Sequence, residues 1–96
     1  MDIRIQAIHF DASEKLEGFI AKKADRLVRH YPDITACDVT LKVVKPETAM
    51  NKHVQIKLIV PQQPELVAEK TADTFEEAVD QALDALDRQL ERYKDK

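Results

Sequence analysis

Glycine and cysteine are almost absent from this 96-residue chain, and tryptophan is missing. Because Gly18 is the only glycine, a glycine-rich phosphate-binding loop cannot form. Because Cys37 is the only cysteine, no disulfide can form within the chain, which agrees with a reducing compartment. The first ten residues place charges inside their apolar run, unlike a signal peptide or a membrane span. We therefore expect a cytoplasmic protein.

Groups that can carry catalysis are also few. His9, His30 and His53 do not show the spacing of metal ligands. We interpret Cys37 as a small, half-buried residue at the start of a strand. Because a converging set of nucleophile, base or metal ligands is lacking, we expect no enzyme, no metal and no cofactor. An enzyme that uses Cys37 stays open as an alternative, which thiol alkylation would test.

The charge balance limits the partners. The chain has 15 Lys and Arg against 18 Asp and Glu, a formal net charge of -3. A nucleic-acid-binding domain is usually basic as a whole, so contact with nucleic acid here requires charge that is segregated on the surface. The hydrophobic fraction of 44% and the charged fraction of 34% fit a soluble globular protein. The length predicts a single domain, residues 1–96.

The residue pattern predicts four strands and a first helix. Residues alternate between apolar and polar in three expected strands, 2–10, 37–45 and 53–60, and a short fourth strand is expected at 65–70. Ser13 is the expected N-cap of a helix that reaches Tyr31 and stops at Pro32. Gly18 lies on the polar side of this helix, where glycine costs about 1 kcal/mol relative to alanine. Close approach of another backbone is one explanation for it.

The stretch 73–96 predicts a long C-terminal helix. Its apolar residues recur at the spacing of one helical stripe: Phe75, Val79, Ala82, Leu83, Leu86, Leu90 and Tyr93. Its acidic residues come first and its basic residues last, which complements the helix dipole. Two amphipathic helices and alternating strands in the order β-α-β-β-β-α predict an α+β two-layer sandwich. In it, both helices cover one face of a four-stranded sheet.

Both expected helices carry a basic stripe. On the first helix, helical geometry places four cations on one face away from the core: Lys15, Lys22, Arg26 and Arg29. Lys23 and His30 lie between that stripe and the core. On the last helix Arg88 and Arg92 lie together, with Lys96 farther round. Two interpretations of these stripes stay open. They are either solvated helix faces without a partner or a phosphate-binding surface in which the two stripes flank a shared groove.

The whole chain resembles the short form of the ribosome hibernation-promoting factor family, also called ribosome-associated inhibitors or subunit-interface proteins. Five segments carry the resemblance: the opening strand with the Ser13-Glu14 helix start, KADRLVRHY at 23–31, LKVVK at 41–45, ADTFEEAVD at 72–80 and LDRQLERYKDK at 86–96. The resemblance implies a fold like the double-stranded-RNA-binding domain with an extra first strand. It also implies binding to the small ribosomal subunit near the decoding region and inhibition of translation in stationary phase or stress.

The same resemblance implies which residues contact 16S-type ribosomal RNA. Matched to the family pattern are Lys23, Arg26, Lys42, Lys45, Arg88, Arg92, Lys94 and Lys96. The helical stripe adds Lys15, Lys22 and Arg29. We expect no DNA or membrane partner. We also expect a monomer that lacks the C-terminal dimerisation domain of long family members.

The chain departs from the family pattern at three places. Ala85 stands where relatives often have lysine, Asp87 adds an acid beside Arg88, and Thr74-Phe75 replaces a Met-Tyr pair. These departures and the net acidity motivate a second hypothesis, a protein-interaction module of the same fold without RNA binding. It would bind a basic protein through the acidic residues of the last helix: Glu76, Glu77, Asp80, Asp84 and Asp87.

Overall fold

The expected order of elements is confirmed. The computed structural model describes residues 2–8, 10–44, 50–62 and 64–94, the last two of them through their backbone only. The elements are β1 (Asp2–Ile8), α1 (Glu14–His30), β2 (Ala36–Val43), β3 (Lys52–Ile59), β4 (Leu66–Ala72) and α2 (Phe75–Lys94). Their bounds differ from the expected ones by a few residues, as at the end of β1, where Ile8 is the last strand residue.

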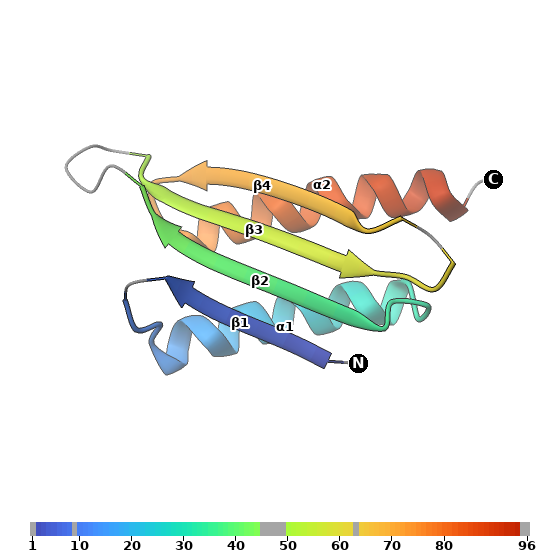
Figure 1. The fold of residues 1–96 in the computed structure, drawn as a ribbon, viewed down its shortest axis with the longest axis horizontal. Helices are drawn as coiled ribbons and strands as arrows, with labels where there is room; N and C mark the ends of the chain where they lie inside the picture. The colour runs from blue at the N-terminus through green and yellow to red at the C-terminus, as the bar shows by residue number, and fades with distance from the viewer. Residues whose placement is uncertain (1, 9, 45–49, 63, 95–96) are drawn as a thin grey trace.

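The four strands form one sheet in the order β1-β2-β3-β4 (Figure 1). β2, β3 and β4 pair antiparallel through hairpin connections, whereas β1 pairs parallel to β2. A parallel pair needs a crossover connection, which α1 supplies. The order places β1 and β4 at the two edges, so α1 and α2 start from opposite edges of the sheet.

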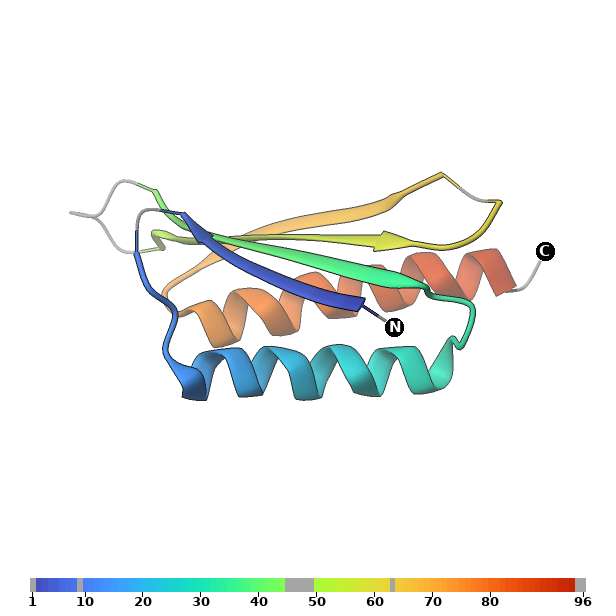
Figure 2. The ribbon, with the colours of Figure 1, turned by 60° about the horizontal axis from the view of Figure 1, so that its bottom comes forward.

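Both helices cover the same face of the sheet (Figure 2). α2 packs against β3 and β4, and α1 lies beside α2 on the side of β1. The core between the two layers takes alternate strand residues and the apolar stripes of both helices, including Ile20, Leu41, Ile56, Leu86 and Leu90. Among the residues that the structure describes, no helix covers the opposite face of the sheet.

Each helix begins at a hydroxyl cap. The Leu16 N–H donates to Ser13 Oγ over 3.1 Å, which confirms Ser13 as the N-cap of α1. The Glu77 N–H donates to Thr74 Oγ1 over 3.1 Å at the start of α2. Thr74 and Glu77 have the T-x-x-E spacing of a capping box, a signal that was present in the sequence. The departure at Thr74 therefore has a structural role.

Gly18 lies in open space. A Cβ built on Gly18 meets no heavy atom within 4 Å beyond the immediate helix backbone and chain neighbours, so no other described segment approaches it closely. Its φ is not positive. The idea that another backbone of this chain packs against Gly18 is therefore wrong for the described part of the protein.

Candidate RNA interface

The outer face of α1 is basic, as its spacing predicts. Lys15, Lys22, Arg26 and Arg29 are all exposed. Arg29 Nη2 lies 3.1 Å from Asp25 Oδ2, one turn earlier on the helix. Among the described residues, the other three cations have no carboxylate oxygen within ion-pair distance. Three of the four cations therefore keep all their donors available for an anionic partner.

Lys23 is engaged inside the protein. Its Nζ lies 3.4 Å from Asp80 Oδ1 on α2 and 5.5 Å from the ring centroid of Phe19. The Lys23 side chain is 36% exposed, less than the other α1 cations, because it lies on the flank of α1 that faces α2. Lys23 thus ties the two helices together, and only part of its charge is open to a partner.

A groove of about 310 Å³ separates the two helices, but it is not the groove that the sequence suggested. Lys23, Arg26 and His30 of α1 line one wall. The α2 wall is acidic and is formed by Asp80, Asp84 and Asp87, with Leu27 and Leu83 between the walls. The expectation that both basic stripes flank this groove is therefore wrong. Around α2, the acidic residues lie between the apolar core stripe and Arg88. They therefore face α1, and Arg88 lies farther from it.

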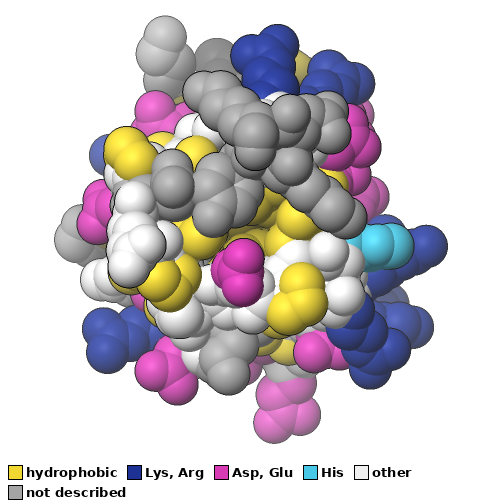
Figure 3. All heavy atoms as spheres, turned by 90° about the vertical axis from the view of Figure 1, so that its right-hand side faces the viewer, with side chains coloured by type: hydrophobic (Ala, Val, Ile, Leu, Met, Phe, Trp, Pro, Cys, Tyr) yellow, Lys and Arg dark blue, Asp and Glu magenta, His cyan; other side chains and the backbone are white. Residues whose placement is uncertain are grey.

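Arg88 and Arg92 are exposed on α2, beyond this acidic wall. Arg88 Nη2 lies 3.0 Å from Asp84 Oδ2, with 77% of the Arg88 side chain exposed. Ala85 is half-buried and packs against the core, so a lysine in its place would need to extend past that contact. Figure 3 shows the end of the molecule where both helices finish, with Lys and Arg side chains at the rim and Asp and Glu side chains among them.

Lys42 lies on the other side of the molecule. It pairs with His53 in the sheet register and alternates with the buried Leu41, which places it on the helix-free face. The structure therefore does not bring Lys42 together with the helix cations. Lys45 and Lys96 lie outside the described residues, as does the side chain of Lys94.

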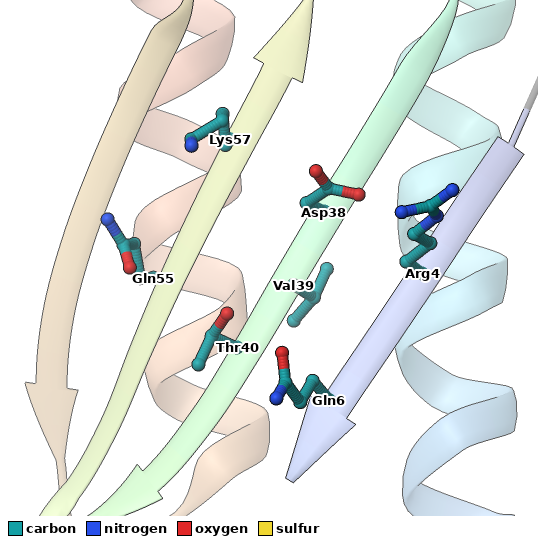
Figure 4. Close-up of a pocket in the computed structure, with 7 residues that line it drawn as sticks. All are labelled: Arg4, Gln6, Asp38, Val39, Thr40, Gln55 and Lys57. Carbon is teal, nitrogen blue, oxygen red and sulfur yellow. The ribbon is translucent and has the colours of Figure 1, made fainter. Parts of the chain in front are cut away.

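The helix-free face also has a polar hollow of about 260 Å³ (Figure 4). Arg4 of β1, Asp38 of β2 and Lys57 of β3 stand side by side across three strands. Gln6, Thr40 and Gln55 form the neighbouring row. Because a carboxylate separates the two cations, this face repels part of any phosphate chain laid across it. The sequence did not indicate that Arg4 and Lys57 belong to one surface, since their proximity depends on strand register.

Comparison with known proteins decides the family. Residues 3–96 match the family model described as Sigma 54 modulation protein / S30EA ribosomal protein. The chain belongs to this S30EA family. The match covers nearly the whole chain and confirms the resemblance found in the sequence.

Curated relatives of this S30EA protein are named ribosome hibernation promoting factor. The one from Pseudomonas putida is 30% identical over 96 residues, which cover all of this chain and 89% of the relative. The one from Azotobacter vinelandii is also 30% identical, with 85% of its length covered.

Two solved structures share the fold. A ribosomal subunit interface protein from Coxiella burnetii superposes with a TM-score of 0.88 at 24% identity, over 100% of both chains. The N-terminal domain of Protein Y from Thermus thermophilus superposes with a TM-score of 0.79 at 21% identity, over 97% of this chain and 99% of that one. The α+β sandwich of this S30EA protein is therefore the fold of its relatives.

Cys37 lies in the core of this S30EA protein. Cys37 is 1% exposed, not half-buried as expected. Burial, and to a smaller extent the negative charge of Asp38, raise the pKa of its thiol to about 11. A buried, protonated thiol is a poor nucleophile. Within the described ranges, no three His, Cys, Asp or Glu side chains are placed to hold a metal ion. In the same part of the chain, no helix is long and apolar enough to cross a membrane.

Proposed function

We propose that this protein is a ribosome hibernation factor that binds the small ribosomal subunit near the decoding region. Its occupation of messenger and transfer RNA positions then inhibits translation in stationary phase or stress. The observation that carries the proposal is the α1 stripe, where Lys15, Lys22 and Arg26 are exposed without a described carboxylate partner. The names of the curated relatives support the same role.

The chemistry of this role is binding without catalysis. Lysine and arginine side chains contact phosphates and release the counterions that surround RNA, so affinity falls as salt rises. The shape of folded RNA presents its phosphates and 2′-hydroxyls, which a rigid helix face can contact without reading sequence. The protein needs no cofactor for this. It acts in the cytoplasm as a monomer, with 16S-type ribosomal RNA as its main partner.

The residues of the interface divide by face. Lys22, Arg26 and Arg29 on α1 form its centre, and Arg88 and Arg92 on α2 extend it across the acidic wall. Lys23 also belongs to the interface, but its ion pair with Asp80 weakens its attraction for phosphate. Lys42 lies on the opposite face, so it reaches RNA only if the ribosome surrounds the protein. Lys45, Lys94 and Lys96 stay predictions of the family pattern.

Co-sedimentation with purified small subunits tests the proposal. We expect wild-type protein to sediment with the subunits at low salt and to dissociate at high salt. The double variant Arg26→Glu/Arg88→Glu is expected to lose binding with an unchanged circular dichroism spectrum. The matched control Arg4→Glu/Lys57→Glu makes the same change in net charge on the other face and is expected to bind more tightly than the helix variant. Absence of wild-type binding at low salt would contradict the proposal.

A second candidate function is favoured by the acidic wall of the groove. Asp87 faces α1 there beside Asp80 and Asp84, which favours contact with a basic protein. A pull-down from nuclease-treated lysate separates the two functions. RNA removal eliminates a ribosome signal, whereas a basic protein partner stays bound and is lost when Asp84 and Asp87 are changed to asparagine.

A further inference from the structure

Gly18 lies at the edge of the basic stripe of α1, where the stripe meets the acidic flank of the helix. Lys15 precedes it by three residues and Lys22 follows it by four, so the three residues succeed one another along one helix face. Arg26 and Arg29 continue the same face toward the end of α1. The stripe therefore has a gap without a side chain between two exposed lysines.

The described structure gives no internal reason for glycine at this position. Gly18 lies in the second turn of α1, inside the helix, where glycine is less stable than alanine. Its φ is not positive, so no turn requires it. An added Cβ would meet nothing within 4 Å beyond the immediate helix backbone and chain neighbours, so no neighbouring segment requires it either. The remaining physical reason is close approach by something outside this chain.

We propose that the sugar–phosphate backbone of folded RNA packs directly against α1 at Gly18, with Lys15 and Lys22 contacting the phosphates on either side. The occupant is argued from charge: Lys15 and Lys22 border the gap on the side of the stripe, with Glu14 on the other side, and a phosphate chain complements the two lysines. The missing side chain lets that backbone reach the helix, since any Cβ would hold it away. The inference rests on the proposed ribosome binding and names Gly18 as the point of closest approach.

Two substitutions separate close approach from simple charge attraction. Gly18→Ala is expected to raise the melting temperature by about 3–6 °C, because alanine favours the helix, while weakening binding to small subunits. Gly18→Lys adds a fifth cation to the stripe, so simple attraction predicts tighter binding. Close approach predicts binding about tenfold weaker, because the side chain fills the gap. The control Gln81→Lys adds the same charge at an exposed position of α2 and is expected to bind at least as tightly as wild type.

The outcomes distinguish this inference from the proposed function. If Gly18→Lys binds as tightly as wild type while Arg26→Glu/Arg88→Glu does not bind, the inference at Gly18 is overturned and ribosome binding stands. If wild type itself does not sediment with small subunits, both are overturned. A fluorescent hairpin RNA competed with polyglutamate tests the occupant. If polyglutamate displaces the labelled hairpin from the wild-type protein as well as unlabelled hairpin RNA does, the occupant is an acidic protein surface and not RNA.

Discussion

The ammonium of Lys23 lies 3.4 Å from the carboxylate of Asp80, across the groove between α1 and α2. The same ammonium lies over the ring of Phe19. An ion pair this exposed contributes little stability, at most about 1 kcal/mol. Its larger consequence is electrostatic, because Asp80 begins an acidic wall that lies between the cations of the two helices.

Neutralising the acidic wall should strengthen ribosome binding. The triple variant Asp80→Asn/Asp84→Asn/Asp87→Asn releases Lys23 and Arg88 and removes three charges that repel phosphates. We expect severalfold tighter co-sedimentation at low salt, and a smaller gain at high salt because salt screens these charges. The control neutralises three exposed carboxylates elsewhere: Asp11, Glu17 and Asp33. If both triple variants gain equally, net charge and not the groove is responsible.

Removing the hydroxyl cap of α2 should destabilise the fold. Thr74→Ala loses the hydrogen bond that the Glu77 N–H donates to Thr74 Oγ1. We expect a loss of about 1 kcal/mol in the free energy of unfolding and a melting temperature lower by about 4–8 °C. Thr74→Ser keeps the hydroxyl and should stay close to wild type. An equal loss in both variants would show that the Thr74 methyl group, not the cap, is what matters.

Cys37 should make stability depend on alkaline pH. The folded protein holds the thiol proton up to a pKa of about 11, whereas the unfolded chain releases it near 9. Below pH 9 the protonated thiol contributes roughly 2–3 kcal/mol to the free energy of unfolding, and this contribution is lost as pH rises toward 11. Urea unfolding of wild type and Cys37→Ala at pH 8 to 11 measures it. Their stability difference should shrink or reverse with pH, and parallel curves would contradict the prediction.

The stacked rings of Phe10 and Phe75 should couple the connection between β1 and α1 to the start of α2. Their centroids lie 5.2 Å apart with an interplanar angle of 9°. A double-mutant cycle with Phe10→Leu and Phe75→Leu is expected to give a coupling free energy of about 0.5–1.5 kcal/mol. Strict additivity of the two single substitutions would mean that the rings contribute by burial alone.

The sequence by itself determined the elements and their faces. Alternation predicted three of the strands, and the fourth was expected as a short strand before the last helix. Helical periodicity predicted both helices and the outward stripe from Lys15 to Arg29, and a serine just before the first helix predicted the Ser13 cap. These features depend on residues a few positions apart in one element, so local spacing specifies them. The family followed from the sequence as well, because its segments keep their order along the chain.

Only the tertiary structure decided which charges meet. An apolar stripe fixes the side of α2 that faces the sheet, but not which flank faces α1, since that depends on the order of the strands. That order turned Asp80 and Asp84 toward α1 and left Arg88 beyond them. Strand register likewise brought Arg4, Asp38 and Lys57 together across three strands. The open space around Gly18 is also tertiary, because it depends on where every other described segment lies.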